Sequence, residues 1–254
     1  MERITSRKNA YIRRLRLLST DGDYRREQGE FLCDGIKTLR EALAFGASVS
    51  SVLWKEGGES AFGVDGAEAY LAPADLFDYA SPLKNSAGPL FSVRLRGCTK
   101  PGPLSRAIVL EGVQDPGNVG TVIRTANAFG IDAVILTGDC ADLYHPRTVR
   151  ATMGAIFRQA VLTMETDCLG DFLKDQGLPL YGAALREDAA DIRSCLLDRC
   201  AVAVGSEGHG LSDRMLALCE KTLIIPMMPE SESLNAAVAA GVVMWEMSRQ
   251  AKGG

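Results

Sequence analysis

Short apolar runs alternate with helical patterns through residues 106–250, and this alternation constrains the fold more than any other feature of the sequence. The runs that predict strands lie at 106–113, 132–138, 157–164, 179–185, 200–208 and 221–227, and the helical patterns lie at 121–130, 168–177, 212–219 and 233–250. Residues 144–155 are expected to form a long loop. Repeated strand–helix units predict a parallel sheet with helices on both faces. Ligands of such sheets bind at the carboxyl ends of the strands, so chemistry is expected in the loops after the strands at 106–113, 132–138, 200–208 and 221–227.

The first part of the chain predicts a smaller α/β domain. Its first helix is expected to end near Leu18, with Thr5 or Ser6 as its cap, and shorter strand and helix patterns follow. Residues 98–105 are rich in glycine and proline, which is typical of a linker. The sequence therefore predicts a domain at 1–97, a linker at 98–105 and a larger domain at 106–254.

Composition places the chain among ordinary globular proteins. Hydrophobic residues make up 46% and charged residues 24% of its 254 residues, and no apolar run is long enough to span a membrane. The N-terminus lacks the apolar core of a signal peptide. The seven cysteines form no CxxC pair and their number is odd, which argues against a metal site or a disulfide framework. We therefore expect reduced thiols, no bound metal and a cytoplasmic location.

Charge is distributed unevenly along the chain. Residues 1–26 hold eight basic and three acidic side chains, a net charge of +5, whereas the whole chain carries −4. Such asymmetry favours a polyanionic partner for the N-terminal part. A solvated helix face without a partner is the alternative interpretation.

The loop and helix after the strand at 106–113 are unlike a dinucleotide site. Their sequence, DPGNVGTVIRTANAFG, lacks the GxGxxG pattern, and Pro116 removes a backbone donor where a pyrophosphate needs one. This weakens the hypothesis of a nicotinamide-dependent oxidoreductase. The helix that follows presents Arg124 from its polar side. Taken singly, Arg124 could be a solvated charge and Asn118 a helix cap.

Two later loops also carry polar residues among small ones. Glu207 lies in a glycine-rich loop, where it would repel a phosphate but could accept from a hydroxyl, an amine or an arginine. Ser233 and Asn235 lie at the start of the final helix. That helix is apolar nearly all round and contains Trp245, which predicts that it serves both as core and as the interface of a homodimer.

Three segments together resemble a known family. DPGNVGTVIRTANAFG, VAVGSEGHGLS and IIPMMPESESLNAAVA are similar in order and separation to the motifs of the SpoU branch of the SPOUT RNA methyltransferases. The N-terminal segments SRKNAYIRRLR and EFLCDGIKTLREAL resemble a small RNA-binding domain built like a ribosomal protein. The resemblance covers nearly the whole chain. It implies a parallel-sheet methyltransferase domain with a deep trefoil knot, preceded by an RNA-binding domain.

The resemblance implies an activity and a set of site residues. S-adenosylmethionine is the implied methyl donor, and the ribose 2′-OH of structured RNA is the implied acceptor. The implied catalytic residues are Arg124, Asn118, Glu207, Ser233 and Asn235. The implied donor-binding residues are Gly205, Ile225, Leu234, Thr137 and Gly138. The residues expected to contact RNA are Arg7, Lys8, Arg13, Arg14, Arg147 and Arg150.

Several alternatives stay open at this point. Ribosomal RNA is preferred as the substrate because of the N-terminal resemblance, but transfer RNA, a base-methylating SPOUT enzyme and a non-catalytic RNA-binding module are the competing hypotheses. The role of Arg124 is also open. An arginine stays charged in proteins, which favours electrostatic stabilisation of the developing alkoxide over proton abstraction. A base role would need an unusually desolvated site.

Overall fold

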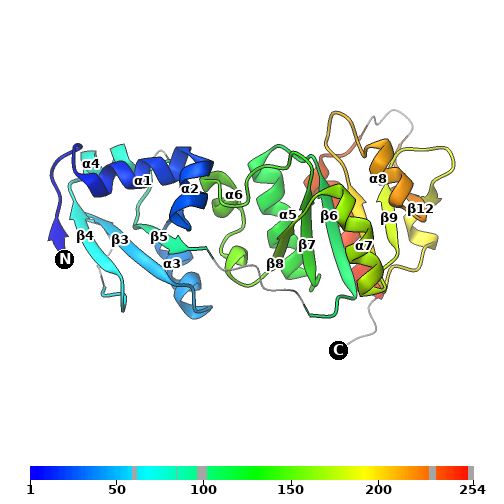
Figure 1. Ribbon diagram of the computed structural model, residues 1–254, viewed down its shortest axis with the longest axis horizontal. Helices are drawn as coiled ribbons and strands as arrows, with labels where there is room; N and C mark the ends of the chain where they lie inside the picture. Colours follow the sequence, from blue (N-terminus) through cyan, green and yellow to red (C-terminus); the bar gives the residue numbers. More distant parts are fainter. Residues whose placement is uncertain (59–61, 84, 96–101, 229–232, 251–254) are drawn as a thin grey trace. The chain divides into compact units, whose positions relative to one another are not determined.

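A computed structural model describes residues 1–58, 62–83, 85–95, 102–228 and 233–250 of the chain (Figure 1). The chain divides into two compact units. The N-terminal unit comprises Met1–Gly97 together with Asp142–Phe157, and the C-terminal unit comprises Cys98–Ala141 and Arg158–Gly254. The predicted linker at 98–105 lies partly outside the described residues, which resume at 102, and Cys98 lies wholly outside them.

The N-terminal unit is built on a mixed five-stranded sheet of order β1–β4–β3–β5–β2 (Figure 1). Its strands are β1 (Glu2–Arg3), β2 (Glu30–Asp34), β3 (Val49–Lys55), β4 (Glu68–Ala72) and β5 (Leu90–Arg94). Its first four helices are α1 (Ala10–Thr20), α2 (Gly22–Gln28), α3 (Ile36–Ala44) and α4 (Ala74–Ala80). Asn9 caps α1, so the expected cap at Thr5 or Ser6 is wrong. The chain is still held at the sheet up to Ile4, whose backbone N–H donates to the carbonyl of Leu71, and the helix therefore begins later.

Alternate side chains of this sheet enter two separate cores. On one face, Leu32 and Leu53 pack with α1 and α4. On the other face, Phe31 and Val52 pack with α3 and with Val149 from the later segment 142–157. That segment therefore completes a core of the N-terminal unit, although it lies in the sequence between two strands of the C-terminal unit.

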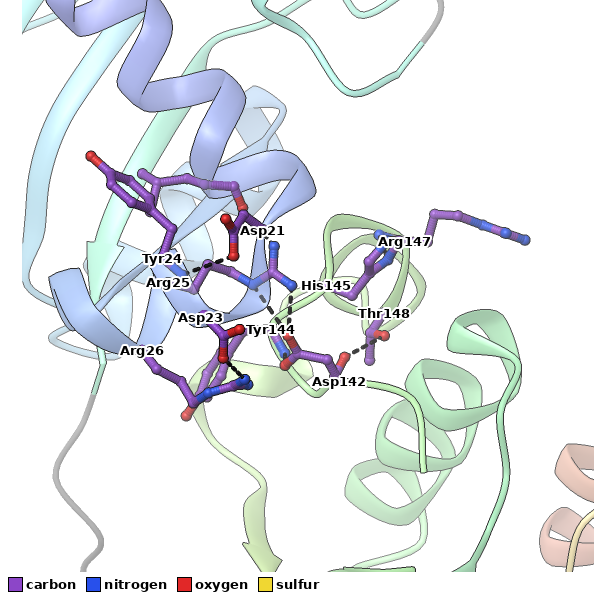
Figure 2. A network of polar contacts seen from close by, with 11 residues as sticks. Asp21, Asp23, Tyr24, Arg25, Arg26, Asp142, Tyr144, His145, Arg147 and Thr148 are labelled. Atoms are coloured by element: carbon purple, nitrogen blue, oxygen red, sulfur yellow. Dashed lines mark hydrogen bonds and ion pairs between the residues drawn. The ribbon is translucent and has the colours of Figure 1, made fainter. Parts of the chain in front are cut away.

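Segment 142–157 includes residues 144–155, which were expected to form a loop of the methyltransferase domain. It contains the helix α6 (Pro146–Ala151), which begins with a proline and is capped by His145. Figure 2 shows how it is attached: Arg25 from α2 donates to Asp142 Oδ2 from Nη2 at 2.6 Å and from Nε at 3.2 Å. Arg25 is 4% exposed, and its Nη1 donates to the carbonyl of Leu18 at 2.8 Å. This ion pair is therefore structural, and one arginine of the basic N-terminal stretch is unavailable to an external partner.

The C-terminal unit contains the expected parallel sheet, here of seven strands in the order β10–β12–β9–β11–β6–β7–β8 (Figure 1). The strands are β6 (Arg106–Glu111), β7 (Ala133–Thr137), β8 (Ala160–Thr163), β9 (Leu180–Ala183), β10 (Ala190–Asp191), β11 (Cys200–Val204) and β12 (Lys221–Ile224). The helices are α5 (Pro116–Ala128), α7 (Thr166–Gln176), α8 (Asp213–Leu218) and α9 (Ala236–Gln250). Every residue of β7 and β11 is buried, as expected for strands covered on both faces.

Helices cover the two faces of this sheet in pairs. Leu169 and Leu173 of α7 and Met215 of α8 share a core with Val109 and Ala203 of the sheet. Helices α5 and α9 contact each other; α5 also contacts β7, and α9 contacts β6 and β11. Side chains alternate between the two faces of a strand, so the strand residues that meet α5 and α9 lie on the face opposite to the core of α7 and α8. The carboxyl ends of the strands, which carry the loops of interest, therefore lie at one edge of the unit.

Within the described residues, no helix is long and apolar enough to cross a membrane, and no group of histidine, cysteine and acidic side chains could hold a metal ion. The described cysteines are unpaired, and Cys33, Cys195 and Cys200 are buried. Burial raises the pKa of the Cys200 thiol to about 12, so this thiol stays neutral at physiological pH.

Candidate active site

A pocket of about 390 Å³ lies at the carboxyl ends of three neighbouring strands, β9, β11 and β12. Its volume falls in the range of small-molecule sites, about 300–1,000 Å³. Gly205, Ile225 and Leu234, three residues expected to bind the methyl donor, line it. Apolar residues such as Val204, Leu211 and Leu223 form much of the remaining wall. The segments that form it are far apart in the sequence and meet because their strands are adjacent in the sheet.

Gly205 is required where β11 ends, because the chain turns back on itself there. Ser206 and Gly210 pair as an isolated bridge, and Gly210 has a φ of +67°. A Cβ atom on Gly205 would lie 2.1 Å from the carbonyl carbon and oxygen of Gly210 and 2.5 Å from the backbone nitrogen of Leu211. Backbone atoms cannot move aside as a flexible side chain can. The tight turn that forms one wall of the pocket therefore exists only with glycine at position 205.

The end of the same loop is held by Glu111, at the end of β6. Both carboxylate oxygens are used: Ser212 donates its backbone N–H at 2.8 Å and its hydroxyl at 2.7 Å. The Ser212 hydroxyl oxygen also accepts from Met215 N, and so caps α8. The pocket loop thus lies between two fixed points, the buried strand β11 and the capped helix α8.

A polar cluster borders the pocket through Glu207. The Asn118 side-chain amide donates to Glu207 Oε1 and its oxygen accepts from Asn235 Nδ2 at 3.2 Å. Both asparagines sit at helix starts. Asp115 Oδ1 accepts from Asn118 N at 2.9 Å to begin α5, and Asn235 Oδ1 accepts from Ala237 N at 3.0 Å to begin α9. Helix starts therefore fix the positions of two amides around one carboxylate.

This cluster contains three of the five residues expected to be catalytic, and a fourth, Ser233, lines the adjoining pocket. In the described contacts, Asn118 uses one oxygen of Glu207, so the Oε2 oxygen is left to accept from a hydroxyl donor. Glu207 is exposed, and a substrate can reach it from solvent. The arrangement can orient a ribose hydroxyl beside a donor bound in the pocket.

Arg124 is not brought into this cluster by any contact among the described residues. It is exposed on α5, six residues after Asn118, which corresponds to about 9 Å along the helix and about 120° around it. Val122, Ile123 and Ala126 bury the other side of α5. The expected presentation of Arg124 from a rigid, packed helix is thus what the structure has, but its place beside the other polar residues stays a prediction.

Two of the expected donor-binding residues lie elsewhere. Thr137 is buried at the end of β7, where its hydroxyl bonds to that of Thr166 at 2.9 Å, and Gly138 follows with a φ of +62°. Neither lines the pocket. The reason is strand order: β7 is separated from β11 by β6, so the loop after β7 begins two strands away from the pocket wall.

The pocket is also lined by the loop after β9, at Ala184–Leu185–Arg186, and by His209. The sequence patterns indicated neither of them as part of the site. The strand at 179–185 was expected, but its loop was not counted among the informative ones. Its relevance depends on β9 lying between β11 and β12 in the sheet, which the order of strands along the sequence does not indicate.

The residues expected to bind RNA all fall in the N-terminal unit. Arg7, Lys8 and Arg13 are exposed near α1, and Arg150 is exposed on α6, which belongs to this unit through segment 142–157. Arg14 differs, because its Nη2 donates to Glu30 Oε2 at 2.5 Å and Glu30 is buried. The Arg14 guanidinium is therefore neutralised within the unit, and the structure gives no support for its role in RNA contact.

Residues 105–245, more than half of the chain, match the family described as the SpoU rRNA Methylase family. The chain belongs to this family. It is accordingly an RNA methyltransferase, with S-adenosylmethionine as its methyl donor. The match contains the pocket and the Asn118–Glu207–Asn235 cluster, so the family region and the site described above coincide.

Proteins similar over almost the full chain are RNA methyltransferases by name. The 23S rRNA (guanosine(2553)-2'-O)-methyltransferase RlmP of Bacillus subtilis is 30% identical, over 97% of this chain and 99% of its own. A crystal structure of an RNA 2'-O ribose methyltransferase is 30% identical, with a TM-score of 0.82 and 98% of each chain covered. AviRb of Streptomyces viridochromogenes, solved with AdoMet, is 25% identical, with a TM-score of 0.85, over 96% of this chain and 98% of its own.

The pocket fits S-adenosylmethionine. The turn at Gly205 lies in the pocket wall, and an added Cβ there would collide with the backbone of Gly210 and Leu211, so glycine is what allows the wall its shape. Apolar side chains such as Leu211 and Leu223 suit the hydrophobic parts of the donor. Gly205, Ile225 and Leu234, the residues expected to bind it, line the same pocket.

Proposed function

We propose that the chain methylates a ribose 2′-OH of ribosomal RNA, with the acceptor held at the Asn118–Glu207–Asn235 cluster and the donor in the adjoining pocket. The observation that carries the proposal is this cluster. Its residues come from three segments of the chain, 89 and 117 positions apart from Asn118, and they meet at the rim of the pocket. A non-catalytic RNA-binding module would not need this arrangement.

Each part of the site has a task in this reaction. Gly205, Ile225 and Leu234 hold S-adenosylmethionine, which supplies an electrophilic methyl group. The free oxygen of Glu207 accepts from the ribose hydroxyl and orients it, while Asn118 holds the carboxylate in place. Ser233 contributes to the wall between the donor and the acceptor. Positioning of this kind reduces the entropy cost of bringing two reactants together.

Arg124 supplies positive charge in the proposal. As the 2′-OH gives its proton to the hydrogen-bonded oxygen of Glu207 and its oxygen bonds to the methyl carbon, whose bond to sulfur breaks, negative charge builds on the ribose oxygen. A guanidinium stabilises that charge and the neighbouring phosphate. The exposure of Arg124 leaves its side chain accessible to RNA. Proton abstraction by Arg124 is not favoured, since the described residues around it give no sign of the burial that a base role would need.

Methyl transfer in vitro separates the possible substrates. Protein-free 23S rRNA and total transfer RNA are each incubated with the chain and S-adenosylmethionine carrying a labelled methyl group, and the products are analysed after alkaline hydrolysis. We expect label in alkali-resistant dinucleotides from 23S rRNA, because a 2′-O-methyl group blocks cleavage of the next linkage. Label in a base would instead identify a base-methylating enzyme, and label in transfer RNA would identify a different target.

We also infer a homodimer. Helix α9 exposes an apolar ridge made by Val238, Val242 and Trp245, of which Trp245 is 57% exposed. The Trp245 ring meets Phe129 edge-on, with centroids 5.7 Å apart, so the ridge extends onto the end of α5. A contiguous apolar surface of this kind on a folded unit is typical of an interface.

The homodimer predicts a clear effect of Trp245→Glu. A charge at the centre of a desolvated apolar interface should shift the protein from dimer to monomer at micromolar concentration, measured by light scattering. Leu196→Glu is the matched control, because Leu196 is 71% exposed in the same unit and lies outside the ridge. If the parent protein is already monomeric, or if both variants behave alike, the ridge is not the interface.

The remaining parts of the proposal concern architecture and location. The knot is supported by family membership and by the way the loops after β9, β11 and β12 converge on one pocket. The N-terminal unit, with its mixed sheet and basic α1, is proposed as the RNA-binding domain. Residues 1–97 of this unit precede the methyltransferase domain in the sequence, and segment 142–157 joins the unit from within the sequence of that domain. A cytoplasmic location follows from a ribosomal RNA substrate.

A further inference from the structure

The positive charge of residues 1–26 falls into two classes in the N-terminal unit. Four arginines are neutralised by carboxylates, in the pairs Arg3–Glu56, Arg14–Glu30, Arg25–Asp142 and Arg26–Asp23. Four other basic side chains are exposed and form no ion pair within the described parts of the chain: Arg7, Lys8, Arg13 and Arg16. The second class is therefore the one available to an external anion.

Two members of this class gather on one aromatic ring. The guanidinium carbon of Arg7 lies 4.6 Å from the centroid of the Tyr79 ring, and that of Arg16 lies 4.4 Å from it. Arg16 is fixed further, because its Nη1 donates to the carbonyl of Tyr79 at 2.8 Å. Tyr79 belongs to α4 and is itself half-buried against the core formed with α1. The ring is thus a rigid platform for two otherwise long and mobile side chains.

Two guanidinium groups held on one ring repel each other, and the ring's π-electrons only partly offset that repulsion. Within the described residues, no carboxylate forms an ion pair with either group. Since both carbons lie less than 5 Å from the same centroid, they are at most about 9 Å apart, which is close enough to contact two neighbouring phosphates of one RNA backbone. The planar fork of arginine matches a phosphate with two parallel hydrogen bonds.

We propose that Arg7, Arg16 and Tyr79 form a phosphate-binding subsite for the backbone of the substrate RNA, with Tyr79 acting as a positioning residue for the two arginines. The inference rests on the proposed function for the identity of the ligand. It assigns RNA contact to Arg16 and to Tyr79, and it excludes the ion-paired arginines of the same stretch. The subsite belongs to the N-terminal unit and shares no residue with the donor pocket or with the Asn118–Glu207–Asn235 cluster. We therefore expect it to affect substrate affinity and to leave the turnover rate at saturating RNA unchanged.

The test compares two double variants that remove the same charge from the same stretch. Arg7→Gln/Arg16→Gln removes the subsite, and Arg3→Gln/Arg26→Gln removes two exposed arginines that are ion-paired, with side chains 61% and 67% exposed. Binding of protein-free 23S rRNA is measured across salt concentrations. The subsite variant should bind at least ~10-fold more weakly and should lose about 1.4 from the salt slope, at about 0.7 per phosphate contact. The control should retain the parent slope and bind within about threefold.

Substitutions at Tyr79 test the positioning role separately. Tyr79→Phe keeps the ring and should match the parent, whereas Tyr79→Leu keeps both charges and should still weaken binding and raise the KM for RNA without lowering kcat. Equal losses in the two double variants, or parent-like binding by Arg7→Gln/Arg16→Gln, would overturn the subsite while leaving the proposed function intact. A parent protein that binds the RNA yet forms no 2′-O-methyl group would overturn the proposed function instead, and leave the subsite standing.

Discussion

Arg124→Ala should lower the rate of RNA methylation by ~10²–10³-fold and leave the affinity for S-adenosylmethionine unchanged. A loss of this size is typical when one charge-stabilising donor is removed from a transition state. The fold should survive, because Arg124 is exposed and the buried side of α5 is formed by Val122, Ile123 and Ala126. Donor affinity should survive because Arg124 does not line the pocket. Single-turnover rates give the first quantity and calorimetry gives the second.

Two further variants make this result specific. Arg124→Lys should recover little activity, since a point charge cannot replace a planar fork that engages an oxygen and a phosphate together. Arg199→Ala is the matched control: Arg199 is exposed at the amino end of β11, opposite the pocket, and donates to the carbonyl of Gln176 at 2.9 Å. If Arg124→Ala methylates RNA within a few-fold of the parent and of this control, Arg124 is a surface charge without a role in the reaction.

Gly205→Ala should damage the donor pocket itself. The added methyl group would lie 2.1 Å from the carbonyl group of Gly210, so the turn at residues 205–211 has to open. Overpacking of this kind costs about 1–3 kcal/mol. Where this free energy destabilises the loop conformation that binds the donor, the affinity for S-adenosylmethionine should fall roughly 10–100-fold, at about 1.4 kcal/mol per tenfold change. Calorimetric titration of the variant with S-adenosylmethionine measures this directly.

The same loop offers its own control. Gly208 has open space around its Cα and no neighbour within 4 Å of an added Cβ, so Gly208→Ala should bind the donor like the parent. The pair therefore separates a specific close approach from a general need for glycine in the loop. Equal affinities for Gly205→Ala and the parent would mean that this turn does not form the wall of the donor site.

Local sequence patterns predicted the parts of the site that depend on local structure. The parallel sheet was predictable because buried strands and amphipathic helices have different periodicities, and the packed face of α5 followed from the same argument. Gly205, Ile225 and Leu234 were placed by resemblance to family motifs, and all three line the pocket. What these features share is that each depends on a few consecutive residues.

Features that depend on distant contacts could not be predicted in this way. Thr137 and Gly138 were expected at the donor site, but strand order places β6 between β7 and β11. Residues 144–155 were expected to form a loop, yet within segment 142–157 Val149 completes a core of the N-terminal unit and Asp142 neutralises Arg25. The net charge of the N-terminal stretch also does not show which basic residues are available to RNA. Arg14 is ion-paired with Glu30, whereas Arg7 lies over the ring of Tyr79.

The most direct test of the central claim is a map of ribose 2′-O-methyl groups in ribosomal RNA from cells with and without this protein. We expect one 2′-O-methyl group of ribosomal RNA to disappear when the protein is absent. The parent protein and Arg199→Ala should restore it, whereas Arg124→Ala should not. An unchanged ribose map in the absence of the protein, or the loss of a methyl group from a base instead, would contradict the account.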